Sequence, residues 1–301
     1  MQLLRTPDER FQNLPDYPFE PNYLHIDSGD GGTLRVHYLD EGPRAASPVL
    51  LLHGEPSWSF LYRKMVPPLV DAGYRVVAPD LVGFGRSDKP AERSDYTYKR
   101  LVDWTTLVIE SLDLHDITLF CQDWGGLIGL RIAIDQEGRF ARLVVANTGL
   151  PVGGEMPDAF YSWRDASQRL SRFPVARIVN SSTTTALSKE VKAGYDAPFP
   201  DESYKAGARV LPTLVPVDPE DPEAAANRIA WRKLMKWDKP LLTTFSDSDP
   251  ITRGGDKPFQ RLVPGAKEQA HVTVENAGHF LQEDKGEELA EIIKRFISQT
   301  N

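Results

Sequence analysis

Hydrophobic and polar positions alternate at the start of the chain and then give way to continuous apolar runs. Residues 23–28 and 33–39 alternate, and the glycine-rich segment 29–32 between them is a turn signal, so a β-hairpin is expected. From residue 48 onward, short runs that are apolar throughout alternate with segments of helical periodicity. A strand that is apolar throughout is buried on both faces, as in a parallel sheet covered by helices. The pattern therefore predicts an α/β protein with a mostly parallel central sheet.

The elements expected after the hairpin follow in regular order. Strands are expected at residues 49–52, 75–80, 118–122, 143–147, 241–245 and 271–275, and helices at residues 61–72, 98–112, 125–136 and 285–298. Residues 1–22 are rich in Pro, Asp and Asn, and we expect them to form an irregular arm over the surface.

This alternation of strands and helices stops after the sixth strand. Residues 150–235 hold short amphipathic pieces, the polar tract 181–185 and an acidic loop at 217–222, but no convincing buried strand. A chain of 301 residues lies near the limit of one hydrophobic core, so one large domain with an insertion fits better than two equal halves. We expect a core domain of residues 1–149 and 236–301 and a helical cap of residues 150–235.

Composition excludes several classes of partner. The 43 acidic and 35 basic residues give a net charge of −8, which disfavours binding to nucleic acid or anionic membranes. Cys121 is the single cysteine, so no intrachain disulfide is possible. The first residues lack the apolar core of a signal peptide, and no apolar run is long enough to span a membrane. These features predict a cytoplasmic protein.

Candidate chemical groups lie where the expected strands end. In an open parallel sheet, functional groups collect at the carboxyl ends of the strands. Four such ends carry polar side chains here: segment 53–56, Asp123-Trp124, Asp249 and His279. Their order of acid, acid and histidine matches a nucleophile, an orienting acid and a base on this architecture.

Asp123 is the candidate nucleophile. It follows a buried strand, and Gly125 and Gly126 directly after it indicate a tight turn that opens a helix and raises one side chain above the sheet. An aspartate in this place can also serve as a helix N-cap, but a cap does not need so constricted a turn. Cys121 stands two positions earlier, where such a turn usually has a small residue.

His279 is the candidate base by elimination. It follows a strand directly and precedes the last helix. The other five histidines lie in the hairpin, in a polar connection, at a strand start or in a turn where a structural role is expected: His25, His37, His115, His271 and His53. For the orienting acid, Asp249 and Asp247 compete on one loop, and Asp249 is preferred. Asn147 has no charge with which to stabilise an imidazolium.

The segment His53-Gly54-Glu55-Pro56 suggests an oxyanion hole. Its glycine and proline constrain the backbone, which leaves the amide of Glu55 free to point into the site. Together with the amide of Trp124 it would stabilise an oxyanion, although a simple turn is the alternative interpretation.

Three segments together resemble the haloalkane dehalogenases of the α/β-hydrolase fold: Gln122-Asp123-Trp124-Gly125-Gly126, residues 53–63 (HGEPSWSFLYR) and Ala277-Gly278-His279-Phe280. The likeness covers nearly the whole chain, and the helical insertion stands where that family carries its cap. The resemblance implies hydrolysis of a carbon–halogen bond to a primary alcohol, a halide and a proton, without a metal or organic cofactor. The implied partners are a small haloalkane, water and halide, and we expect a monomer.

The resemblance also implies a halide site. The glutamate in the segment His-Gly-Glu-Pro, Glu55, resembles one branch of the family, in which the second halide ligand is a tryptophan of the cap. The segment Ala159-Phe160-Tyr161-Ser162-Trp163 is similar to the part of the cap that supplies this tryptophan. Trp124 and Trp163 are therefore the implied halide ligands. The other tryptophans considered do not fit the motif and are expected in the core: Trp58, Trp104, Trp231 and Trp237.

Two alternative functions remain at this point. An epoxide hydrolase shares the aspartate turn but needs cap tyrosines, and Tyr161, Tyr195 and Tyr204 lie in the insertion outside any tyrosine motif we recognise. A non-catalytic receptor on the same fold would keep the pocket but would not need His279. A serine-type esterase is disfavoured because the turn carries Asp123.

Overall fold

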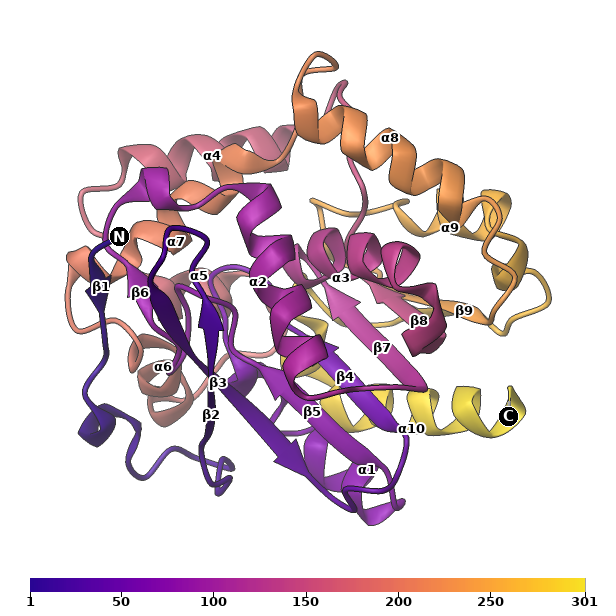
Figure 1. Ribbon diagram of the computed structural model, residues 1–301, viewed down its shortest axis with the longest axis horizontal. Helices are drawn as coiled ribbons and strands as arrows, with labels where there is room; N and C mark the ends of the chain where they lie inside the picture. Colours follow the sequence, from indigo (N-terminus) through magenta and orange to yellow (C-terminus); the bar gives the residue numbers. More distant parts are fainter. Residues whose placement is uncertain (301) are drawn as a thin grey trace.

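The computed structural model describes residues 1–300, which are built around an eight-stranded sheet with helices on both faces (Figure 1). The strands lie in the order β10-β9-β8-β7-β4-β5-β3-β2, in which β3 is antiparallel to β2 and β5 and every other neighbouring pair is parallel. Their bounds are β2 (Asn22–Asp27), β3 (Thr33–Glu41), β4 (Pro48–Leu52), β5 (Arg75–Pro79), β7 (Ile117–Gln122), β8 (Phe140–Ala146), β9 (Leu241–Ser246) and β10 (Val272–Val274). The predicted mostly parallel sheet and its hairpin are confirmed.

The central strands are almost entirely apolar because helices cover both of their faces, and the polar residues of β7 are Thr118 and Gln122. Every residue of β4 and β7 is buried. The covering helices are α1 (Val66–Asp71), α2 (Tyr98–Ser111), α3 (Trp124–Asp135), α9 (Asp256–Leu262) and α10 (Leu281–Gln299). Helix α1 packs against α10 and α2 against α3, and Figure 1 shows the two pairs on opposite faces of the sheet.

Helices alone occupy the insertion between β8 and β9. They are α4 (Asp158–Arg169), α5 (Val175–Ser181), α6 (Lys189–Asp196), α7 (Ala206–Val210) and α8 (Pro222–Leu234). This confirms a helical insertion after the sixth strand of the main sheet. Helix α8 lies against α3, to which an ion pair between Glu223 and Arg131 connects it. The division into a core and a cap at residues 150 and 235 stays a prediction.

Two expected helices have different bounds. Residues 61–72 were expected to form one helix, but a short 3-10 helix covers Ser59–Tyr62 and α1 begins only at Val66. The reason is the pair Pro67-Pro68, because a proline has no amide hydrogen and fits only the first turn of a helix. The last helix begins at Leu281 rather than at residue 285, and its backbone is non-helical at Lys285.

The N-terminal arm is more ordered than its composition indicates. Strand β1 (Leu3–Leu4) pairs with β6 (Lys89–Pro90), and a 3-10 helix covers Asp8–Phe11. The Thr6 hydroxyl donates to the carbonyl of Pro198 at 2.6 Å, and Nε of Arg10 donates to the carbonyl of Ala197 at 2.7 Å. The expectation of an irregular surface arm is therefore wrong in part, since the arm joins the sheet region to the helical insertion.

A buried polar cluster forms a second connection to the insertion. The Arg63 guanidinium pairs with the Glu283 carboxylate of α10, and the Tyr195 hydroxyl of α6 donates to the same carboxylate.

Of the helices described, none combines the length and the apolar character that a membrane crossing requires.

Candidate active site

Asp123 stands at the turn between β7 and α3, in a backbone conformation that few residues other than glycine adopt. Its φ is 51° and its ψ is −127°. Its amide donates to the carbonyl of Asn147 at 3.0 Å, and its carbonyl accepts from the Thr148 hydroxyl at 2.7 Å. Contacts from the end of β8 thus hold the turn in place and raise the Asp123 side chain above the edge of the sheet.

The two glycines after Asp123 lie too close to neighbouring residues to carry a side chain. A Cβ on Gly125 would overlap with the carbonyl of Leu52 in β4, and a Cβ on Gly126 would overlap with the side chain of Thr148. The start of α3 therefore packs directly on the neighbouring strand ends, which explains the glycine pair in the sequence.

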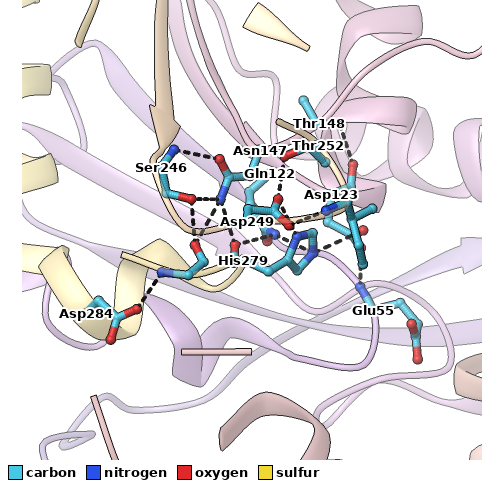
Figure 2. Close-up of polar contacts among 12 residues, drawn as sticks. Glu55, Gln122, Asp123, Asn147, Thr148, Ser246, Asp249, Thr252, His279 and Asp284 are labelled. Atoms are coloured by element: carbon cyan, nitrogen blue, oxygen red, sulfur yellow. Dashed lines mark hydrogen bonds and ion pairs between the residues drawn. The ribbon is translucent and has the colours of Figure 1, made fainter. Parts of the chain in front are cut away.

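The structure brings Asp123, His279 and Asp249 together in one chain of contacts (Figure 2). Nδ1 of His279 lies 2.9 Å from Oδ2 of Asp249, and Nε2 lies 3.5 Å from Oδ2 of Asp123. Asp249 is fully buried, and its carboxylate also accepts from the Thr252 hydroxyl and from the Ile251 amide. Asp249 can therefore orient the imidazole that faces Asp123.

Asp247, the competing acid, has a different position. It is exposed, and its carboxylate accepts hydrogen bonds from the amides of Asn276 at 3.0 Å and Ala277 at 3.3 Å. It ties the end of β9 to the loop before His279 and does not contact the imidazole.

Burial and charge act in opposite directions on the pKa values of His279 and Asp249. Burial lowers the pKa of His279, but the charges and hydrogen bonds of Asp249 and Asp123 outweigh it and raise that pKa to about 10. Burial raises the pKa of Asp249, but the charge and hydrogen bond of His279 and the Thr252 hydroxyl bring it down to about 2. Asp249 is therefore a carboxylate that strongly favours a proton on His279.

The side chains of Asp123 and His279 open into a cavity of about 120 Å³. Trp124 and Trp163 line the same cavity, so the structure brings the two predicted halide ligands to one space. The remaining wall is mainly apolar, and it comes from both the sheet side and the insertion: Pro56, Phe160, Ile178, Pro212, Val215, Ile251 and Phe280.

Glu55 meets the site with both its backbone and its side chain. Its amide donates to Oδ1 of Asp123 at 2.8 Å, as an oxyanion-hole donor would. The hydrogen bonds found within residues 1–300 do not include one from the amide of Trp124 to that carboxylate. The Trp124 amide belongs to the first turn of α3, where amides have no partner within the helix.

Glu55 lines the cavity, and its carboxyl group is buried beside Trp163, a contact that sequence reasoning missed. Burial and the charge of Asp123 raise its pKa well above the ordinary value, while His279 and a hydrogen bond from the Trp163 side chain act against this rise. The raised pKa favours a neutral acid. A neutral group beside two indoles does not repel an anion.

Two further polar residues at the strand ends were also missed. Asn147 has no charge for the role of orienting acid, but its side-chain amide donates to the Ser246 hydroxyl at 2.8 Å and to the carbonyl of His279 at 3.1 Å. Gln122, the last residue of β7, donates to the same carbonyl. Their positions at strand ends were the available signal, because polar groups there converge on one edge of the sheet.

The other histidines and tryptophans lie away from this cavity. His53 is buried, and its Nε2 accepts from the amide of Leu81 at 2.9 Å, which fits the structural role expected for it. Trp58, Trp104 and Trp237 are buried in the core as predicted. Trp231 is half-buried and packs against Phe259.

Comparison with known proteins gives consistent relatives. The family model described as "alpha/beta hydrolase fold" matches residues 47–286. A haloalkane dehalogenase of Psychrobacter cryohalolentis is 58% identical over 298 residues, which are 99% of this chain and 98% of that protein. One of Mycolicibacterium paratuberculosis is 55% identical and covers 97% of both chains. The tetrameric structure of haloalkane dehalogenase DpaA from Paraglaciecola agarilytica matches with a TM-score of 0.91 at 39% identity, over 97% of each chain.

Proposed function

Since the chain belongs to the haloalkane dehalogenases, hydrolases of the α/β-hydrolase fold that act on carbon–halide bonds, we propose that it converts small haloalkanes and water to a primary alcohol, a halide and a proton. One observation carries this proposal. The cavity that receives the Asp123 carboxylate and the His279 imidazole is also lined by two tryptophans, Trp124 at the start of α3 and Trp163 from the insertion.

In the first step, the Asp123 carboxylate attacks the sp3 carbon that bears the halogen. An oxygen–carbon bond forms, the carbon–halogen bond breaks, and the bonding pair leaves with the halide. A carboxylate carries its charge at neutral pH, so this attack needs no base. The halide is held by Trp124 and Trp163, because an indole N–H donates a hydrogen bond and brings no acceptor that repels an anion. The product on the protein is an alkyl ester of Asp123.

In the second step, His279 removes a proton from a water molecule that attacks the carbonyl carbon of the ester. The amides of Glu55 and Trp124 stabilise the oxyanion, and Asp249 stabilises the imidazolium. The carbon–oxygen bond between the Asp123 carbonyl carbon and the alkoxy group then breaks, and the imidazolium of His279 gives its proton to the leaving alkoxide oxygen, so that the alcohol leaves. The carboxylic acid formed on Asp123 releases its proton to solvent, which restores the carboxylate. The 2.9 Å contact of His279 with Asp249 and the 2.8 Å hydrogen bond from Glu55 to Asp123 support these roles.

The branch with a cap tryptophan is part of the same proposal, and two features support it: Glu55 stands beside the halide site, and Trp163 reaches the cavity from α4. The residues that line the cavity do not include Tyr161, Tyr195 or Tyr204, the tyrosines that an epoxide hydrolase would need. Tyr195 donates its hydroxyl to Glu283 instead.

A halide-release assay tests the function directly. We expect bromide from 1,2-dibromoethane and chloride from a chloroalkane, with styrene oxide left unchanged. Diol formation from styrene oxide without halide release from either haloalkane would refute the proposal in favour of an epoxide hydrolase. Stoichiometric binding of an apolar ligand with no turnover of any of these compounds would support the receptor instead.

We also propose that residues 150–235 act as a cap domain and that the enzyme is a cytoplasmic monomer. The related Paraglaciecola enzyme is described as tetrameric. Size-exclusion chromatography with light scattering therefore tests the proposed monomer, and a measured mass equal to several chains would refute it.

A further inference from the structure

Gln122 is a fully buried polar residue that directly precedes Asp123. Its Nε2 lies 3.1 Å from Nε2 of His279 and 3.1 Å from the carbonyl oxygen of His279 (Figure 2). Its Oε1 is buried and finds no hydrogen-bond partner among residues 1–300. An unpaired buried acceptor costs free energy, and its neighbours in β7 are apolar, so the carboxamide is not explained by packing.

The carbonyl of His279 fixes the orientation of this carboxamide. A backbone carbonyl oxygen can only accept a hydrogen bond, so the group that faces it is the NH2 of Gln122 rather than its oxygen. The same NH2 therefore faces Nε2 of the imidazole. An N–H aimed at this nitrogen favours the neutral ring whose proton is on Nδ1, because a protonated Nε2 would bring two donors together.

Three ionisable groups face His279: Asp249 after β9, Asp123 after β7 and Glu55 after β4. The two aspartates favour the imidazolium, but a base has to be neutral before it can take a proton from water. Formation of the ester removes the charge of Asp123. The remaining carboxylate, Asp249, still favours the imidazolium, and the N–H of Gln122 opposes this by disfavouring a proton on Nε2.

We propose that Gln122 is a positioning residue that holds His279 as the neutral Nδ1–H tautomer, with Nε2 ready to accept the proton of the water that hydrolyses the ester. This inference rests on the proposed function. It concerns the second step alone, because the attack of Asp123 on the haloalkane uses no base.

The test is Gln122→Met, which keeps the size of the side chain but removes the N–H. Asn147 still donates to the carbonyl of His279 in this variant. With 1,2-dibromoethane we expect the bromide burst of the first turnover to be unchanged. Hydrolysis of the ester at neutral pH should slow about tenfold, and its pH profile should shift upward by roughly one pH unit, so that the rate recovers in alkaline buffer. The ester is followed by intact-protein mass.

Gln122→Glu is the second variant, because it keeps the shape of the side chain and places an oxygen towards Nε2. It should shift the pH profile in the same direction and further. Gln282→Met is the matched control, since Gln282 is also fully buried but does not line the cavity, and it should leave both steps unchanged.

An unshifted pH profile in both Gln122 variants would overturn the inference, as would an equal slowing of the burst and of hydrolysis. A protein of unchanged sequence that releases no halide burst would refute the proposed function itself, so the two failures are distinguishable.

Discussion

Replacing Asp249 by Asn removes the charge that stabilises the imidazolium of His279 without changing the shape of the side chain. The amide oxygen of Asn can still accept from Ile251, and its NH2, which takes the place of Oδ2, can donate to the Thr252 hydroxyl. The same NH2 faces Nδ1 of His279, so it also disfavours the tautomer with the proton on Nδ1 and adds to the cost of losing the charge. The geometry of the loop should therefore survive. What changes is the free energy of the step in which His279 takes a proton from water.

The size of this change follows from the pKa of His279. Burial disfavours the imidazolium, but Asp249 and Asp123 raise the pKa from 6.5 to about 10. One pKa unit corresponds to about 1.4 kcal/mol, so the surroundings stabilise the imidazolium by roughly 5 kcal/mol relative to water. Asp249 is the nearer carboxylate, at 2.9 Å against 3.5 Å for Asp123. We assign about half of this stabilisation of the imidazolium to Asp249. Loss of its charge then costs roughly 2 to 3 kcal/mol, which slows ester hydrolysis about a hundredfold.

The assay is rapid mixing with 1,2-dibromoethane, followed by quantification of bromide and by intact-protein mass. In Asp249→Asn we expect a bromide burst of one equivalent per chain at close to the unchanged rate, then accumulation of the ester on Asp123. Asp247→Asn is the matched control, because Asp247 lies on the same loop, is exposed and does not contact His279.

Three results would refute this reasoning. The first is a burst slowed as strongly as hydrolysis, which would mean that Asp249 maintains the shape of the whole site. The second is unchanged steady-state turnover, which would remove Asp249 from the mechanism. The third is accumulation of ester in Asp247→Asn but not in Asp249→Asn.

Three other substitutions test the remaining parts of the site. His279→Phe should release one halide per chain and then stall as an ester on Asp123, and an unmodified protein mass after stoichiometric halide release would exclude the assigned roles. Trp163→Phe removes one indole donor and should weaken bromide binding about tenfold or more, measured by quenching of tryptophan fluorescence; unchanged affinity would exclude Trp163 as a ligand. Gly54→Ala places a Cβ where the Asp123 carboxylate lies, so the bromide burst should slow at least about a hundredfold, and a normal burst would show that the nucleophile tolerates displacement.

Much of the fold could be predicted from the sequence because burial on both faces leaves a direct signal. Strand β4 is apolar throughout and β7 is apolar except at Thr118 and Gln122, and this pattern indicates a covered parallel sheet. Element bounds were less accurate where backbone chemistry overrides periodicity. The shortened α1 shows this, since Pro67 and Pro68 confine the helix to the residues from Val66 onward.

The site divides in the same way. Asp123, Asp249 and His279 were found because parallel strands bring their carboxyl ends to one edge, so order along the chain is enough to propose their meeting. The hydrogen bond from Gln122 to the loop of His279 depends on side-chain orientations that no local pattern encodes. The burial that raises the pKa of Glu55 depends on how the insertion covers the sheet, which is equally absent from the local sequence.

Residues from both ends of the chain contact the part of the insertion that supports the cavity wall. Thr6 and Arg10 hold the residues just after α6, and Glu283 of α10 holds Tyr195 within it. Helix α6 packs in turn against α5, whose Ile178 lines the cavity. The first residues of the chain are thus connected to the cavity wall through the contacts of α6 and α5. An N-terminal tag that displaces Thr6 or Arg10 is therefore expected to change the kinetics, although neither residue lines the cavity.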